Sequence, residues 1–212
     1  MFDLPITTII IQSLVGFNIA IYLSRFRKNN DAYKIFALYL LVIGVNQYIS
    51  IVVGTGFHQN NLMHFHVYFI AQFIILTFFY VEMLKQKWLF AILAAVGVFL
   101  VYQYSMNPEM ISRYNPIGVT LTQGLLVLYS LAYFYKFLKG EDEFIIINIA
   151  LFFYLLSSIL IFASGNLVFH KEILSEEGHT LLINVNRVLY FAFQILILIQ
   201  WWKTYSPAKA KL

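Results

Sequence analysis

The side chains that could do chemistry in this chain stand inside long apolar stretches. Arg187 is the one charge well inside such a stretch. Its guanidinium would suit a carboxylate or a phosphate, because it can bind two oxygens at once. Asn184, Phe191 and Gln194 continue the same spacing of three or four residues, so a helix would place all four side chains on one face. The stripe holds no nucleophile paired with a base, which indicates binding or helix packing.

Polar residues recur at helical spacing in other apolar stretches as well. His64, Tyr68 and Gln72 repeat every four residues, and Asn46 precedes Ser50 by four. An amide or a charge inside a bilayer is costly unless it finds a partner. We therefore predict a polar cavity between helices, in the outer half of the membrane, lined by Arg187, Asn184, Gln194, Gln72, Tyr68, Asn46, Gln123 and Ser157. The alternative is that these amides and hydroxyls join packed helices, and that Arg187 snorkels to the interface or pairs with an acidic residue of the preceding loop.

Several catalytic patterns are absent from the sequence. All ten acidic residues lie at the ends of apolar stretches or between them, which argues against a carboxylate proton pump or an intramembrane aspartate protease. The last apolar stretch has no lysine for a retinal Schiff base. No His-Glu-x-x-His, GxGxxG, P-loop or Gly-x-Ser-x-Gly motif occurs either. We predict no enzymatic activity and no cofactor.

The histidines could form a metal site only at the outer face. His64 and His66 are two residues apart, so on a helix they point about 200° away from each other. A site that uses His64 and His179 together with other loop histidines is geometrically possible. Interfacial histidines in polar loops account for the pattern more simply, so we predict no metal. The absence of cysteine excludes disulfides and thiolate ligands.

The elements that must position these side chains follow from the composition. Hydrophobic residues make up 61% of the 212 residues and charged residues 11%, whereas soluble domains carry about 25% charged residues. Apolar stretches long enough to cross a bilayer require about 20 residues each. We predict an all-α bundle of seven transmembrane helices forming a single domain over 1–212, with spans at approximately 5–24, 34–53, 64–83, 88–105, 116–138, 144–169 and 180–202.

The basic residues predict the orientation of these spans. With seven spans, only Arg113 and Lys171 flank one face, and eleven basic residues fall on the other. Because cytoplasmic loops carry the excess of Lys and Arg, the N-terminus is predicted outside and the C-terminus in the cytoplasm, in the inner membrane. The basic pI of about 9.1 then needs no nucleic-acid partner. The eleven residues are Arg25, Arg27, Lys28, Lys34, Lys85, Lys87, Lys136, Lys139, Lys203, Lys209 and Lys211.

Short aromatic motifs recur over most of the chain. The segment NLMHFHVYFIAQF at 61–73 leads into FFY at 78–80, and NIALFFY at 148–154, SS at 157–158 and NRVLY at 186–190 follow. Together they resemble small, largely uncharacterised seven-span proteins common in Bacteroidota. The resemblance implies a sensor-like inner-membrane protein, related in style to membrane input modules of two-component systems. It implies no particular reaction.

The pattern leads to one expected function and two alternatives. The polar stripes without catalytic groups favour a membrane sensor or accessory subunit that binds a small molecule or a lipid. The loops are too short to signal alone, so such a protein would act through another membrane or cytoplasmic signalling protein. The alternatives are a small transporter or channel subunit and a structural subunit of a larger membrane complex. The sequence predicts neither the ligand nor the oligomeric state.

Overall fold

The computed structural model describes residues 5–138, 143–163 and 176–206, and within them it contains seven α-helices and no strand. The predicted all-α class is thereby confirmed. The long helices are α1 (Ile6–Ser24), α2 (Asp31–Ile51), α3 (Leu62–Leu84), α4 (Leu89–Met106), α5 (Pro116–Phe137), α6 (Ile145–Ala163) and α8 (Glu176–Tyr205). Three short elements connect them: the 3-10 helices η1 (Phe26–Lys28) and η3 (Pro108–Ser112) and the π-helical turn η2 (Val52–Gly56).

The helices have the length and composition of membrane spans. Six of them carry a stretch long and apolar enough to cross a bilayer, and α6 adds a shorter apolar stretch, Ile145–Ile161, within the described residues. The chain is therefore a multi-pass membrane protein by helix length and hydropathy. Residues 164–169 of the predicted sixth span lie outside the described residues.

The helix boundaries differ from the predicted spans by a few residues. The second helix begins at Asp31 and not near residue 34, because the side chain of Asn30 accepts a hydrogen bond from the backbone N–H of Tyr33 at 2.9 Å and so caps the helix start. The last helix extends beyond the predicted span at both ends, since it runs from Glu176 to Tyr205. Hydropathy marks the apolar core of a span, whereas capping decides where the helix begins.

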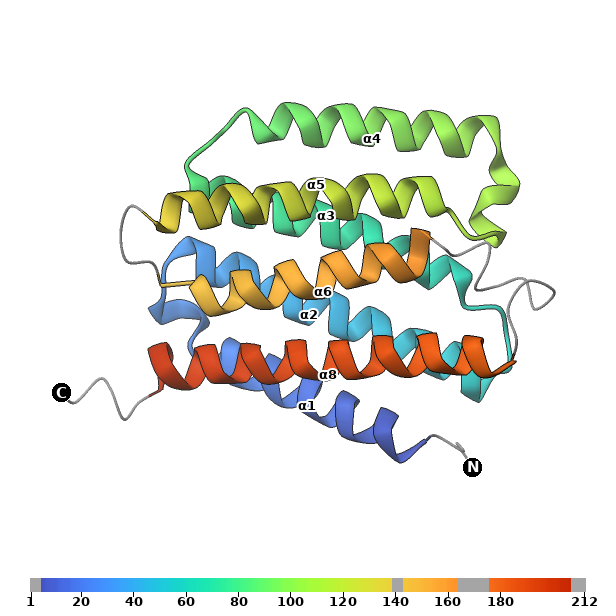
Figure 1. The fold of residues 1–212 in the computed structure, drawn as a ribbon, viewed down its shortest axis with the longest axis horizontal. Helices are drawn as coiled ribbons and strands as arrows, with labels where there is room; N and C mark the ends of the chain where they lie inside the picture. The colour runs from blue at the N-terminus through green and yellow to red at the C-terminus, as the bar shows by residue number, and fades with distance from the viewer. Residues whose placement is uncertain (1–4, 139–142, 164–175, 207–212) are drawn as a thin grey trace.

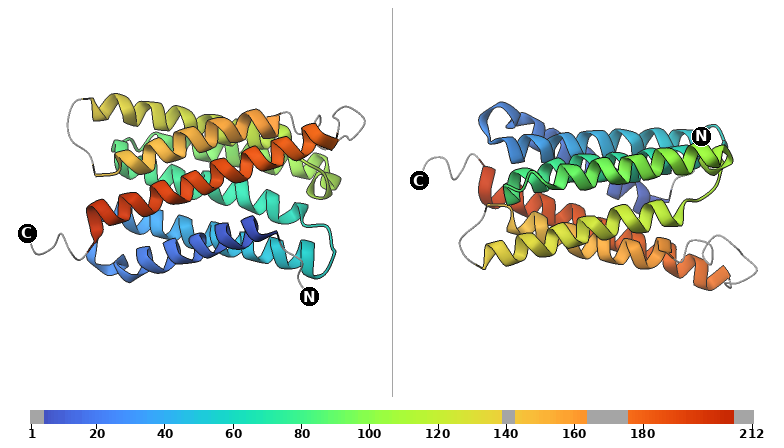
Figure 2. Two further views of the ribbon diagram at one scale, coloured as in Figure 1. Left: turned by 60° about the horizontal axis from the view of Figure 1, so that its bottom comes forward. Right: turned by 90° about the horizontal axis from the view of Figure 1, so that it is seen from above.

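Six helices form a closed ring, and the seventh lies outside it. Around the ring, α1, α2, α3, α5, α6 and α8 each pack against the next, and α8 packs against α1. Helix α4 packs mainly against α3 and η3, beyond the ring (Figure 1). The turned views show α5, α6 and α8 as one layer and α1, α2 and α3 as the other (Figure 2). Helices α1, α3, α5 and α8 all end on the same side of the bundle, which we call the basic end. The opposite side holds a polar hollow between the helices, and we call it the cavity end.

Buried polar side chains join neighbouring helices, both between the two layers and within one. Asn18 on α1 donates to the Oε1 atom and to the backbone carbonyl of Gln194 on α8, at 2.8 and 2.9 Å. Tyr80 on α3 donates to Oδ1 of Asn148 on α6 at 2.9 Å, and Nδ2 of Asn148 donates to the carbonyl of Ser130 on α5 at 3.1 Å. Lipid tails are as apolar as leucine, so such bonds and close packing hold membrane helices together.

A glycine lets α1 and α2 approach closely, which yields a first prediction. A Cβ at Gly44 would lie 2.5 Å from Cδ1 of Ile19 and 3.2 Å from Cγ1 of Val15. We expect Gly44→Leu to lower the free energy of unfolding by about 1–3 kcal/mol, the usual cost of overpacking, as measured by unfolding in detergent micelles. Gly97→Leu is the control, because a Cβ there meets nothing within 4 Å. Equal stability of the two variants would contradict the packing described.

Candidate ligand cavity

A polar hollow of about 350 Å³ lies at the cavity end of the bundle. Five helices of the ring contribute to its wall, and the loop before α5 contributes one tyrosine. We call it the amide cavity, because five of its lining side chains are amides. Its lining residues are Gln12, Asn46, Gln47, Ser50, Ile51, Asn61, Leu62, His64, Phe65, Tyr68, Tyr114, Tyr154 and Asn186.

The rim of the amide cavity is built where α2 ends and α3 begins. Nδ2 of Asn61 donates to Oγ of Ser50 at 3.1 Å, and Nδ2 of Asn46 donates to the carbonyl of His64 at 2.9 Å. The connection must pass close to these groups: a Cβ at Gly54 in η2 would lie 2.9 Å from Nδ2 of Asn61. These contacts hold the ends of α2 and α3 together and place their polar side chains at the opening.

The floor of the amide cavity is a set of tyrosine hydroxyls. One of these tyrosines, Tyr68, lies six residues after Leu62 on α3, which is about 9 Å along the helix at a rise of about 1.5 Å per residue. The hydroxyls of Tyr68 and Tyr154 lie 3.0 Å apart, and Tyr190 donates to Oε1 of Gln47 at 2.9 Å. Beneath them, Nε2 of Gln72 donates to the hydroxyl of Tyr39 at 3.0 Å and to that of Tyr68 at 3.4 Å. These bonds join side chains of α2, α3 and α6 in one network, and the ring of Tyr190 on α8 packs against that of Tyr154 at 5.4 Å.

The amide cavity carries no formal charge from acidic, lysine or arginine side chains, because none of these residue types lines it. Burial raises the pKa of the Tyr114 hydroxyl in the loop, so this group stays neutral as well. Oε1 of Gln12 and Oδ1 of Asn186 are buried and accept no hydrogen bond from the described residues. Such unpaired acceptors are uncommon in folded proteins, and a donor group on a bound molecule would satisfy them.

The stripe around Arg187 faces another part of the molecule. Arg187 and Asn184 line a separate groove of about 460 Å³ between α8 and α1, with Thr7, Ile10, Ile11, Val188 and Phe191. Nη1 of Arg187 donates to Oδ1 of Asn184 at 3.3 Å. Gln194 faces α1 too, through its bonds with Asn18. The four residues share one face of α8 as predicted, but that face points to α1 and not into the amide cavity.

The remaining predicted residues are divided among three places. Asn46, Tyr68 and His64 line the amide cavity, and Gln72 lies in the layer beneath it. Gln123 is buried on α5, and Ser157 is half-buried on α6, with neither among the lining residues. The side chain of His179 lies outside the described residues. In the part of the chain that the structure describes, no group of three or more His, Asp or Glu side chains is placed to hold a metal ion.

Several lining residues could not be singled out from the sequence, among them the polar residues Asn61, Tyr114, Tyr154 and Asn186. Asn186 could have been found from its spacing, because Tyr190 follows it by four residues on a face of α8 next to that of Arg187. The prediction used the neighbouring face instead, because Arg187 is the one charged residue inside that apolar stretch. Asn61 and Tyr114 lie in connections, where helical spacing gives no guidance.

The likeness of this chain to known proteins was tested in three comparisons. No protein-family model matches it, and no match was found among curated proteins or solved structures. The functional interpretation therefore rests on the geometry and chemistry of the amide cavity.

Proposed function

We propose that this chain is a membrane sensor or accessory subunit that binds a neutral small molecule in the amide cavity and acts through a partner protein. The observation that carries the proposal is the amide cavity itself: a hollow of about 350 Å³ where five helices meet, lined by amides and hydroxyls. Bundle interiors of this kind are a usual place for small-molecule sites, and the volume lies within the range of about 300–1,000 Å³ that such sites occupy.

The lining selects the class of ligand. A charged molecule would lose its hydration in the cavity and find no acidic, lysine or arginine side chain there to compensate its charge, which is costly. A neutral molecule with hydrogen-bond donors would satisfy the buried oxygens of Gln12 and Asn186. The rings of Phe65, Tyr68 and Tyr114 line the cavity, and an aromatic or unsaturated ring of the ligand would pack favourably against them. The proposed ligand is therefore a neutral ring compound that carries hydroxyl or N–H groups.

The charge distribution supports a cavity that opens outward. Among the described lysine and arginine residues, only Arg113 and Arg187 lie toward the cavity end. Eight basic residues lie at the basic end: Arg25, Arg27, Lys28, Lys34, Lys85, Lys87, Lys136 and Lys203. By the positive-inside rule the basic end faces the cytoplasm. The proposal thus places the N-terminus outside, the C-terminus in the cytoplasm and the chain in the inner membrane of a bacterium, as the motif resemblance also implies.

Packing below the amide cavity favours sensing over transport. Phe36 lies one turn nearer the basic end than Tyr39, and its ring packs against that of Phe79 at 5.7 Å. The ring of Phe79 in turn packs against that of Phe144 at 5.5 Å. All three side chains are fully buried, so an aromatic layer lies between the amide cavity and the basic end. A transporter would need a path through this layer.

The proposal is tested by identifying what the protein carries. The chain is purified from native membranes in mild detergent, and bound molecules are extracted and identified by mass spectrometry. Candidate molecules are then returned to ligand-free protein while thermal stability is followed. We expect a neutral ring compound that raises the melting temperature, and a second polypeptide that co-purifies. If only charged compounds bind, or if no compound stabilises the protein, the proposal is wrong.

A further inference from the structure

A third hollow, of about 510 Å³, lies at the basic end between α4 and α5. At the cavity end, α4 is tied to the bundle: Nε2 of His66 donates to the Arg113 carbonyl at 2.9 Å, so its Nδ1 atom accepts from the hydroxyl of Tyr104 on α4 at 2.6 Å. Toward the basic end, α4 and α5 are separated by a crevice. Its walls are apolar and include Ile92, Leu125, Leu128 and Ala132.

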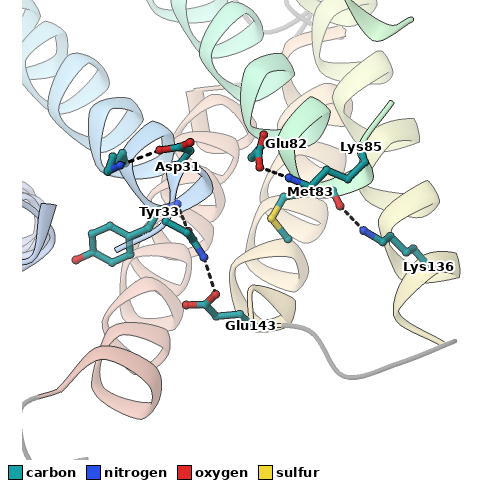
Figure 3. Close-up of polar contacts among 9 residues, drawn as sticks. Asp31, Tyr33, Glu82, Met83, Lys85, Lys136 and Glu143 are labelled. Carbon is teal, nitrogen blue, oxygen red and sulfur yellow. Dashed lines mark hydrogen bonds and ion pairs between the residues drawn. The ribbon is translucent and has the colours of Figure 1, made fainter. Parts of the chain in front are cut away.

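The mouth of the crevice is basic and aromatic. Lys136 and Trp88 both line it. The ammonium group of Lys136 donates to the backbone carbonyl of Met83 at 2.5 Å (Figure 3), which leaves its other two hydrogens for a further acceptor.

The neighbouring charges leave an excess of positive charge at this mouth. Lys85 pairs with the carboxylate of Glu82 (Figure 3), so these two compensate each other. Lys87 precedes Trp88 directly, and among the described residues it forms no ion pair. Lys87 and Lys136 therefore present two cations that no described carboxylate neutralises.

We propose that the crevice between α4 and α5 binds one anionic phospholipid. Its acyl chain would lie along Ile92 and Leu128, and its phosphate would meet the ammonium groups of Lys136 and Lys87. Trp88 would then lie at the level of the lipid headgroups, where tryptophan is enriched in membrane proteins. The crevice shares no lining residue with the amide cavity, so the two are distinct and the inference does not depend on the proposed function.

Two features favour an anionic lipid over other occupants. The walls are apolar, which suits the acyl chain of a lipid and disfavours a hydrophilic solute. The two uncompensated lysines favour a net negative headgroup over a zwitterionic one, since each basic residue near an anionic lipid surface contributes about 1 kcal/mol, or about fivefold in affinity. A soluble phosphate could bind the two lysines but would not contact the apolar walls.

The test counts lipids bound to the full chain in a neutral detergent by native mass spectrometry. The probes are phosphatidylglycerol, phosphatidylcholine with the same acyl chains, and inorganic phosphate. We expect one phosphatidylglycerol to bind at least about fivefold more tightly than phosphatidylcholine, and inorganic phosphate to bind far more weakly. Lys136→Gln and Lys87→Gln should each weaken phosphatidylglycerol binding about fivefold, and Ala132→Phe should abolish it by filling the crevice.

Matched controls separate this site from general attraction to the basic end. Lys28→Gln removes an exposed charge at the same end, and Ala95→Phe adds the same ring to an exposed position on α4 outside the crevice. Both should bind phosphatidylglycerol as the unmodified chain does. Lys87→Gln keeps the test decisive if Lys136→Gln fails to fold, because Lys87 has no bond to Met83. Equal binding of the two lipids, or equal effects of the Lys87 and Lys28 substitutions, would overturn the proposal.

Discussion

Ser50→Trp is expected to weaken binding of the co-purifying ligand by at least about 100-fold, which corresponds to about 2.7 kcal/mol. Ser50 lines the rim of the amide cavity beside Asn61 and His64. An indole at this position would occupy much of a hollow of about 350 Å³, so the ligand and the new side chain could not be accommodated together. Calorimetric titration of the purified variants measures the change in affinity.

The control for this variant makes the same replacement outside the amide cavity. Ser13 lies on α1 next to Gln12, but its side chain is exposed and lines none of the three hollows described above. Ser13→Trp should bind the ligand with unchanged affinity. If Ser50→Trp binds the ligand as tightly as Ser13→Trp does, the ligand occupies another site.

Asn148→Leu is expected to lower the free energy of unfolding of the bundle by about 2 kcal/mol. Leucine has a similar size but neither accepts from Tyr80 nor donates to the Ser130 carbonyl, so two bonds between α6 and its neighbours are lost. Removing one partner of a buried hydrogen bond costs about 1–3 kcal/mol, and individual bonds between membrane helices reach about 1.7 kcal/mol. Unfolding by a denaturing detergent in mixed micelles measures the difference.

Ser130→Ala separates the role of the amide from a general loss of polarity. The hydroxyl of Ser130 makes a long bond, 3.4 Å, to the Asn148 carbonyl, and its removal leaves both bonds of the Asn148 amide in place. We expect a change below about 0.6 kcal/mol, the average for such bonds in a membrane protein. Comparable losses in the two variants would mean that the Asn148 amide has no special role.

The helices could be predicted from the sequence because crossing a bilayer is a strong constraint. A span needs a long apolar stretch whatever its neighbours are, and the predicted stretches around α3 and α5 match those helices to within two residues at each end. The start of α2 differed more because it depends on the Asn30 cap, a local bond that hydropathy does not register.

The rotation of each helix could not be predicted in the same way. In a soluble protein the apolar face points inward, but in lipid both the buried and the exposed faces of a helix are apolar. On α8, the stripe of Arg187 and the stripe of Asn186 are neighbours, and only the packing of the bundle decides which one reaches the ring interior. That packing includes the bond between Asn18 and Gln194, which lie 176 residues apart in the chain.

The natural absence of cysteine allows a direct test of an amide cavity that opens to the outside. Single cysteines are introduced as Ser50→Cys in the cavity, Ser130→Cys in the buried core, Asn107→Cys at the exposed cavity end and Lys28→Cys at the basic end. Each variant, in intact cells and then in permeabilised cells, is treated with a thiol reagent that cannot cross membranes. The same serine-to-cysteine change at positions 50 and 130 makes the two variants a matched pair.

We predict that cysteines at positions 50 and 107 react in intact cells, that the one at position 28 reacts only after permeabilisation, and that the one at position 130 does not react in folded protein. An unreactive cysteine at position 50 beside a reactive one at position 107 would contradict an accessible amide cavity. Reaction at position 50 only after permeabilisation would instead contradict the proposed orientation.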